Sequence, residues 1–235
     1  VRADMSGAVL VLGSATPSVE SYYRAERGEY RLLTLTKRAK ENSRLAGVHI
    51  VDLREELAEG NRSIFSRKLK KLIEDRLEKK QQVMLFMNRR GYAGFVSCRS
   101  CGKAMKCPHC DVSLTYHRNG RLKCHYCGFE RPLPDRCPSC GSPFIAPFGT
   151  GTQKLEEFTK REFPTARVLR MDADTTAKKG AHEEILATFA EGGADILIGT
   201  QMIVKGHDFE NVTLVGVMAA DLSLYAPDFK SAERT

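Results

Sequence analysis

The chain has 235 residues, of which 42% are hydrophobic, and this is enough for one large or two modest domains with an ordinary core. No apolar run approaches the roughly eighteen residues of a membrane span, and no charged-then-apolar signal segment opens the chain. We therefore expect a cytosolic protein. The formal net charge of +8 is a weak indication of acidic partners because it counts eight cysteines as neutral.

The first predicted elements are a strand and a helix. Residues 8–12 (Ala-Val-Leu-Val-Leu) form a continuous apolar run, which is typical of a buried strand in a parallel sheet. A loop of small residues follows at 13–18, and the amphipathic stretch after it predicts a helix through Tyr23 with Ser18 or Thr16 as N-cap. Taken by itself, this loop is an ordinary strand-to-helix turn.

Residues 32–61 predict a connector in which only 48–52 (Val-His-Ile-Val-Asp) has the pattern of a short strand. A helix capped by Ser66 follows, and its apolar side chains share one face. These side chains are Leu69, Leu72, Ile73 and Leu77. The next buried strand is 83–87 (Val-Met-Leu-Phe-Met), and it leads into Asn-Arg-Arg-Gly-Tyr at 88–92.

All eight cysteines lie between residues 98 and 140, in four Cys-x-x-Cys pairs. Four-cysteine zinc sites are built from two such pairs, so eight thiols make two complete tetrahedral sites. Disulfides or redox dithiols are the alternative, but neither an export signal nor a thioredoxin-like strand and helix accompanies these pairs. Eight thiolates that bind two Zn2+ would reduce the net charge of the chain to about +4, which weakens the case for nucleic acid from charge alone.

A predicted hairpin indicates which pairs share an ion. Asn-Gly at 119–120, between alternating apolar and polar residues, is typical of a two-residue turn with positive φ at both positions. This hairpin brings Cys107 and Cys110 onto Cys124 and Cys127 as one site. By elimination the outer pairs form a second site in a nested arrangement. The outer ligands are Cys98, Cys101, Cys137 and Cys140.

Both predicted ions are structural rather than catalytic, because thiolates fill every tetrahedral position. Three histidines, His109, His117 and His125, lie among the ligands, and we expect them at the surface or behind the cysteines. The segment has few large apolar residues, so its order is expected to depend on zinc, which can contribute about 10–16 kcal/mol of apparent binding energy.

The rest of the chain alternates between strands and helices. Phe-Gly-Thr-Gly-Thr-Gln-Lys at 148–154 opens a helix through about Phe163, but it lacks the residue order of a phosphate loop. The further predicted elements are a strand at 167–171, a helix at 182–190, a strand at 195–198 and a strand at 212–218. This alternation predicts an α/β fold with a parallel sheet and helices on both faces.

The loops that follow the predicted strands are the candidate functional loops, because the carboxyl ends of parallel strands carry function in α/β folds. These loops are residues 88–92, 172–176, 199–209 and 219–221.

Three motifs in this order resemble the primosomal replication-restart DNA helicases of superfamily 2. They are Gly-Ser-Ala-Thr-Pro-Ser at 13–18, Asn-Arg-Arg-Gly-Tyr at 88–92 directly before the zinc pairs, and Gly-Thr-Gln-Met-Ile-Val-Lys-Gly-His-Asp-Phe at 199–209. The resemblance covers essentially the whole chain. It implies an ATP-dependent 3′-to-5′ helicase that recognises stalled replication forks and restarts DNA replication. Its implied partners are forked and single-stranded DNA, primosome and restart proteins, and the machinery that loads the replicative helicase.

The resemblance also implies a domain organisation with two RecA-like lobes and a zinc-ribbon-like subdomain inserted in the second. Residues 1–36 would be the tail of lobe one, and 37–80 the linker and first helix of lobe two. Lobe two itself would comprise 81–96 and 144–235, with the zinc-binding insertion at 97–143.

The resemblance assigns roles to residues by position. Ser14, Ala15 and Thr16 would couple nucleotide hydrolysis to lobe movement. Thr200 and Gln201 would contact the DNA backbone, and Gly206 and Asp208 would approach the nucleotide. For each loop the alternative is ordinary turn chemistry. Arg89 and Arg90 are either phosphate contacts or solvated loop charges.

The sequence lacks motifs that a complete motor needs. It contains neither a Gly-x-x-x-x-Gly-Lys-Ser/Thr phosphate loop nor an Asp-Glu box for magnesium. We therefore expect a fragment that neither hydrolyses ATP nor unwinds DNA alone, with ATP and Mg2+ bound by the full-length protein. The alternative function is a non-catalytic zinc-ribbon module that binds proteins or nucleic acid on an inert α/β lobe.

Overall fold

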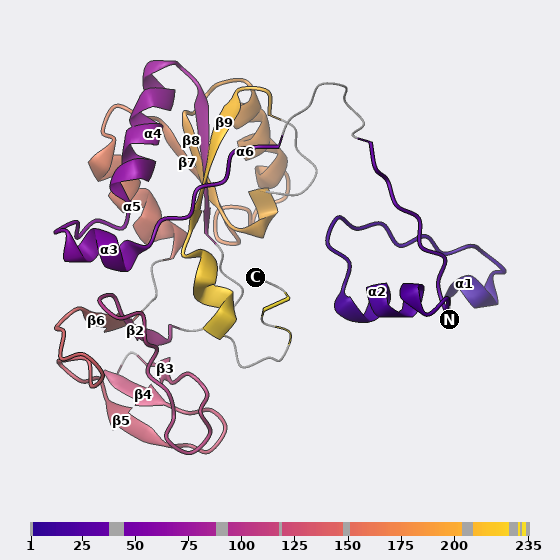
Figure 1. Cartoon of the computed structure of the whole chain (residues 1–235). Coiled ribbons are helices and arrows are strands. Elements are labelled where there is room, and N and C mark those ends of the chain that lie inside the picture. The colour runs from indigo at the N-terminus through magenta and orange to yellow at the C-terminus, as the bar shows by residue number, and fades with distance from the viewer. Residues whose placement is uncertain are drawn as a thin grey trace. The chain divides into compact units, whose positions relative to one another are not determined.

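The computed structural model describes residues 2–37, 45–87, 94–117, 119–147, 151–203, 209–225, 230 and 232–233. It divides into two compact units, Val1–His49 and Ile50–Thr235, and each is described by itself (Figure 1). Among the helices of these residues, none is both long enough and apolar enough to cross a membrane.

The described residues of the first unit form two helices, α1 (Arg2–Met5) and α2 (Val19–Glu26). Ser18 caps α2, because its side-chain oxygen accepts a hydrogen bond from the backbone N–H of Ser21 at 3.2 Å. The strand predicted at 8–12 is wrong: these residues belong to no strand, and Val9 is 89% exposed. An apolar run becomes a strand only where neighbouring strands accept its backbone hydrogen bonds, and the described part of this unit contains none.

The second unit is built on a four-stranded parallel sheet, as the alternation of elements predicts. Its strands lie in the order β7 (Val168–Met171), β8 (Ile196–Gly199), β1 (Gln82–Met87) and β9 (Val212–Met218). Helices flank this sheet (Figure 1). They are α4 (Arg67–Glu78), α5 (Thr152–Glu162) and α6 (Ala181–Ala190).

Alternate residues of the strands separate the core into two layers, because successive side chains of a strand point to opposite faces. Leu85 of β1 packs in one layer with Ile73 of α4 and Leu155 of α5. Leu197 of β8 packs in the other layer with Phe189 of α6. The helices therefore cover both faces of the sheet.

The connector before α4 differs from the prediction. Residues 48–52 form no strand; instead, Asp52 caps a short helix, α3 (Leu53–Ala58), and its carboxylate accepts a hydrogen bond from the N–H of Arg54 at 2.8 Å. Ile50 is 96% exposed, so this strand prediction is wrong for the same reason as the first. Helix α3 was not predicted because six residues, half of them charged, give no clear period.

The cysteine-rich subdomain, defined here as the described residues of 94–147, follows β1 and precedes α5 in the chain. Its outer strands β2 (Val96–Cys98) and β6 (Ile145–Pro147) form an antiparallel pair. A second antiparallel sheet consists of β3 (Thr115–Tyr116), β4 (Arg121–Lys123) and β5 (Glu130–Pro132). These strands, of two or three residues each, are too short for a periodic signal in the sequence.

The predicted hairpin is present between β3 and β4, but its turn is longer than predicted. The N–H of His117 donates to the carbonyl of Arg121 at 2.9 Å, which leaves three residues in the loop rather than two. Gly120 occupies the last of them with a φ of +78°. A glycine in this left-handed conformation is typical of three-residue hairpin loops.

Candidate metal centres and strand-end loops

The four Cys-x-x-Cys pairs share one backbone geometry. In each pair the carbonyl of the first cysteine accepts a hydrogen bond from the N–H four residues later, at 2.8–3.0 Å. The four donors, all with positive φ, are Gly102, Asp111, Gly128 and Gly141. Positive φ favours glycine, and glycine follows three of the four pairs. The sequence therefore carried a further metal-knuckle signal that the spacing analysis did not use.

The sulfur atoms gather in two groups of four, and within each group they lie within 4.8 Å of one another. The Sγ atoms of Cys98 and Cys140 are 3.6 Å apart, and so are the Sγ atoms of Cys107 and Cys127. A disulfide needs about 2.05 Å. Tetrahedral zinc with Zn–S bonds of about 2.3 Å separates its sulfurs by roughly 3.8 Å, so the donor geometry fits zinc.

The two groups are the ones that the hairpin argument predicts. The outer group is Cys98, Cys101, Cys137 and Cys140, and the inner group is Cys107, Cys110, Cys124 and Cys127. In the part of the chain that the structure describes, no histidine joins either group. The rings of His117 and His125 lie 5.3 Å apart, and the ring of His109 lies 5.5 Å from that of Phe129.

The chemistry of the inner group also favours a divalent cation. A hydrogen bond with Cys127, together with burial, raises the pKa of the Cys110 thiol to about 12. Backbone N–H groups of Cys127 and Tyr126 lower the pKa of Cys124 to about 7. Four neighbouring thiols thus resist ionising together. A zinc ion at their centre stabilises all four thiolates, which makes these clusters structural zinc sites with every position filled by sulfur.

A small apolar core lies beneath the ligands. Leu114 and Leu122 are completely buried, and they pack with Cys107 and Cys124 of the inner group. Val96, Met105 and Ile145 complete the buried cluster. A core of this size is marginal by itself, so the zinc ions and the apolar cluster order the subdomain together.

At the carboxyl edge of the parallel sheet, two predicted functional loops lie next to each other. Met171 of β7 is opposite Gly199 of β8, so the loops that start at Asp172 and Thr200 leave the sheet side by side. A side chain at Gly199 would come within 2.4 Å of Ile203 and 2.8 Å of the Met171 carbonyl. The short helix η1 (Gln201–Ile203) therefore packs directly on the end of β8, and it presents Gln201 to solvent.

Asp172 organises this edge. Its buried carboxylate accepts hydrogen bonds from the Thr152 hydroxyl at the start of α5 and from the Arg170 guanidinium, the latter at 2.7 Å. It also accepts the N–H groups of Asp174 and Thr175, each at 3.1 Å. Burial opposes ionisation of Asp172, yet these donors together lower its pKa below the usual range. This loop is one of the predicted functional loops, but the role of its first carboxylate was not predicted.

Asp172→Asn is expected to lower the free energy of unfolding by about 1–3 kcal/mol, because an amide NH2 would face donors that now bind a carboxylate. Urea unfolding followed by circular dichroism measures this. The ionised carboxylate contributes fully above its unfolded-state pKa of about 3.9, and that contribution is lost as pH falls through the lower folded-state pKa. The difference in the free energy of unfolding between variant and wild type should therefore become smaller below about pH 4. Asp174→Asn is the control, and equal losses for both variants would contradict the assignment.

The placement of the remaining predicted site residues relative to one another stays a prediction. Ser14, Ala15 and Thr16 lie in the first unit, where the Thr16 N–H donates to the Ser14 hydroxyl at 3.1 Å and all three residues are exposed. Four others, Arg89, Arg90, Gly206 and Asp208, lie outside the described residues.

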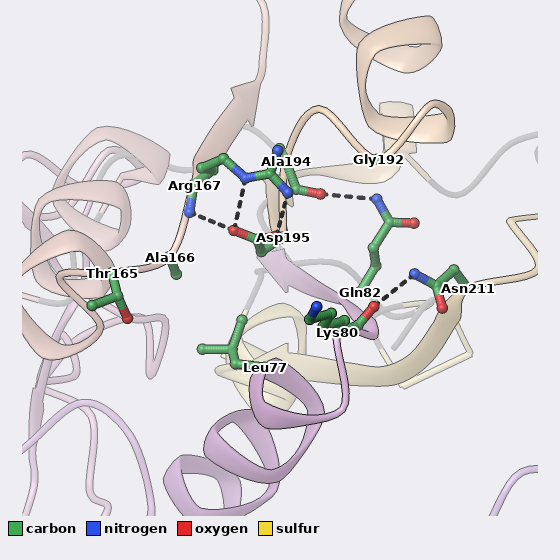
Figure 2. Close-up of a pocket in the computed structure, with 10 residues that line it drawn as sticks. All are labelled: Leu77, Lys80, Gln82, Thr165, Ala166, Arg167, Gly192, Ala194, Asp195 and Asn211. Atoms are coloured by element: carbon green, nitrogen blue, oxygen red, sulfur yellow. Dashed lines mark hydrogen bonds and ion pairs between the residues drawn. The ribbon is translucent and has the colours of Figure 1, made fainter.

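A pocket of about 340 Å³ lies at the opposite, amino-terminal edge of the sheet (Figure 2). Its polar groups bind one another: Arg167 donates to the Asp195 carboxylate at 2.6–3.1 Å, and this lowers the pKa of Asp195. The buried Gln82 donates to the carbonyls of Phe189 and Ala194 at 2.7 and 2.9 Å. We interpret these contacts as structural: they hold the first residues of neighbouring strands together and do not form a ligand site.

Comparison with known proteins identifies similar sequences for these features. Residues 107–132 match the family model described as the PriA DNA helicase Cys-rich region domain. The chain is 57% identical over 235 residues to the replication restart protein PriA of Bacillus subtilis (strain 168) and 49% identical over 242 residues to that of Synechocystis sp.. It is 38% identical over 237 residues to the protein of that name in Rickettsia felis. These matches cover 99–100% of this chain and 29–36% of the relatives, so the chain spans about a third of their length.

Proposed function

We propose that this chain, which belongs to the PriA family of replication restart proteins, is the part of an ATP-dependent 3′-to-5′ DNA helicase that carries its zinc-binding subdomain. The helicase would recognise stalled replication forks and restart replication in the bacterial cytosol, together with primosome proteins and the machinery that loads the replicative helicase. The similarity over all 235 residues carries this proposal. The position of two four-cysteine sites between β1 and α5 of a parallel α/β unit supports it.

The α/β part of the second unit would be the second motor lobe, and residues 1–36 the tail of the first. The carboxyl edge of the sheet would then face DNA. Thr200 and Gln201 stand at this edge, directly after β8. Short hydroxyls and backbone N–H groups bind phosphate without reading bases, as a translocating motor requires. Arg89 and Arg90 would add phosphate contacts from the loop after β1.

Nucleotide chemistry would involve groups on both units and beyond this sequence. Gly206 and Asp208 would approach the nucleotide, and Ser14, Ala15 and Thr16 would couple its hydrolysis to lobe movement. The sequence has no phosphate loop or Asp-Glu box, so we assign the binding of ATP and Mg2+ to other parts of the longer protein.

An assay of forked-DNA unwinding tests the proposal on two proteins, this 235-residue chain and the longer protein from the same gene. The longer protein is expected to hydrolyse ATP in response to DNA and to separate the fork, whereas the chain alone should do neither. DNA-stimulated ATP turnover by the chain alone would refute the assignment of ATP binding to other parts of the longer protein. A longer protein without any ATPase activity would favour the alternative, a non-catalytic zinc-ribbon binding module.

Within the longer protein, Thr200→Ala tests the proposed DNA contact. The loss of one phosphate hydrogen bond, about 1 kcal/mol, should weaken binding to single-stranded DNA roughly fivefold. Thr213→Ala on β9 is a matched control, because the Thr213 hydroxyl is exposed and donates to Gln81 at 2.9 Å.

A further inference from the structure

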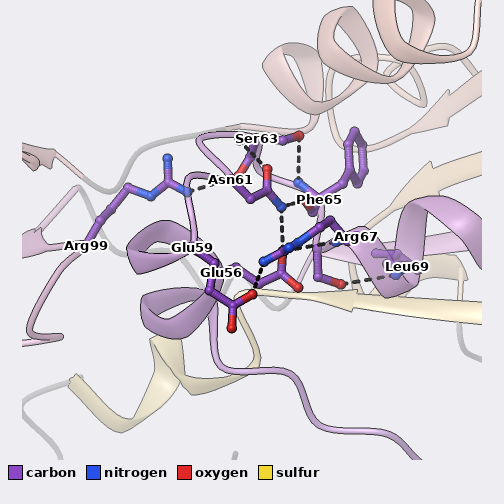
Figure 3. A network of polar contacts seen from close by, with 9 residues as sticks. Glu56, Glu59, Asn61, Ser63, Phe65, Arg67, Leu69 and Arg99 are labelled. Carbon is purple, nitrogen blue, oxygen red and sulfur yellow. Dashed lines mark hydrogen bonds and ion pairs between the residues drawn. The ribbon is translucent and has the colours of Figure 1, made fainter.

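The outer zinc group is attached to the α/β part of its unit through Arg99, the residue that follows the ligand Cys98 (Figure 3). The Arg99 guanidinium donates to two successive carbonyls of the loop between α3 and α4. Nη1 lies 3.0 Å from the backbone oxygen of Arg62, and Nη2 lies 2.9 Å from the backbone oxygen of Ser63. A planar guanidinium is suited to such paired acceptors because its donors form a rigid fork.

The loop that receives Arg99 is itself held firmly. The Asn61 amide donates to Glu56 at 2.6 Å and to the carbonyl of Phe65 at 2.9 Å, and its oxygen accepts the N–H of Ser63 at 2.9 Å. Phe65 is 2% exposed, and its ring lies 5.9 Å from that of Phe163. The two carbonyls are therefore fixed to the core of the α/β part.

Two other contacts join the same surfaces. The Arg62 guanidinium lies 5.5 Å from the centre of the Phe144 ring. Within the subdomain, the Phe144 carbonyl also accepts the backbone N–H of Arg99 at 2.8 Å, which fixes Phe144 to the same segment. Gly102 packs against the side chain of Arg54, since a Cβ at Gly102 would lie 3.3 Å from Arg54 Cδ. All three contacts come from the segments 98–102 and 137–144, which the outer group ties together.

The ion pairs around the inner group lie within the subdomain and do not reach the α/β part. Lys106 binds Asp111 at 2.8 Å, and Arg121 binds Glu130 at 3.2 Å. Each pair joins two residues of the cysteine-rich subdomain to each other. The inner group thus orders the distal hairpin, whereas the outer group stands where the subdomain meets the α/β part.

We infer that the outer zinc site is the joint that sets the orientation of the cysteine-rich subdomain on the α/β part, and that Arg99 is its positioning residue. Zinc holds the segments 98–101 and 137–140 in one rigid body. The two hydrogen bonds of the Arg99 guanidinium then fix this rigid body relative to the carbonyls of residues 62 and 63. The inner zinc site has no share in this orientation.

Arg99→Ala in the 235-residue chain tests the inference by nuclear magnetic resonance. Hydrogen exchange of the Ser63 and Phe65 amides should accelerate about tenfold, because two charge-assisted hydrogen bonds to their loop are lost. Residual dipolar couplings should report one alignment tensor for the sheet and the subdomain in the wild type, and two different tensors in the variant. The zinc content should stay at two ions per chain in both proteins.

Arg136→Ala is the matched control. Arg136 also adjoins an outer ligand, Cys137, but it donates to the carbonyl of Gly141 within its own knuckle at 3.2 Å. It should therefore leave exchange and alignment unchanged, and Arg99→Lys should restore part of the wild-type behaviour. Identical results for Arg99→Ala and Arg136→Ala would overturn the inference.

A second pair of variants separates the two metal sites. Cys140 and Cys127 are the exposed last ligands of the outer and inner groups. Cys140→Ser should reproduce the effect of Arg99→Ala on the loop at 61–65, and Cys127→Ser should disturb only the hairpin at 107–132. The opposite pattern would show that the inner site sets the orientation.

Discussion

Removal of both zinc ions is expected to unfold the cysteine-rich subdomain while the four-stranded sheet stays folded. The subdomain has one small apolar cluster around Leu114 and Leu122, and its knuckles converge on the two sulfur groups. Structural zinc contributes about 10–16 kcal/mol of apparent binding energy, which exceeds the net stability of most domains. Without the metal, four crowded thiols remain at each centre, and in the inner group the hydrogen bond with Cys127 raises the pKa of the Cys110 thiol.

Hydrogen exchange read by mass spectrometry after chelation measures this. Peptides from 96–98, 115–123 and 130–132 should lose their protection, whereas peptides from β1, β8 and α5 should keep it. Re-addition of Zn2+ in stoichiometric amount should restore the protection, and Mg2+ should not, because thiolates prefer the softer ion. Loss of protection in β1 and β8 at the same chelator concentration would contradict the independence of the two cores.

Leu85→Ala is expected to destabilise the α/β part and to leave the zinc sites intact. The free energy of unfolding of the α/β part should fall by about 2–5 kcal/mol. Leu85 is completely buried in the central strand β1, where it lies between Ile198 of β8 and Gly216 of β9. Its removal leaves a cavity among side chains of the layer that α4 and α5 cover. The chain has no tryptophan, so urea unfolding is best followed by circular dichroism.

Val215→Ala provides the control for this substitution. Val215 is on the neighbouring strand β9 but is 56% exposed, so its truncation should change stability by less than about 0.5 kcal/mol. The zinc content of Leu85→Ala should remain two ions per chain in the native state. A variant that lost zinc together with its sheet stability would show a single cooperative core instead of two.

The two strand predictions that proved wrong have a common physical cause. Residues 8–12 and 48–52 have the apolar composition of strands, but Val9 and Ile50 are exposed and pair with no strand in the described structure. Strand formation depends on hydrogen bonds from a neighbour that is distant in sequence, which composition alone does not report. The cap at Ser66 was predicted correctly, and Ser18 was one of the two predicted caps of its helix, because capping is local.

The sequence by itself determined the α/β alternation, the four parallel strands of the second unit and the two nested groups of four cysteines. These features rest on local periodicity, on Cys-x-x-Cys spacing and on one short hairpin, all of which act over a few residues. The tertiary structure alone decided which carboxylate organises the strand-end loops and where the subdomain is attached. Asp172 meets Thr152, and Arg99 meets Arg62, across 20 and 37 residues of chain. Such contacts arise only when folding brings distant elements together.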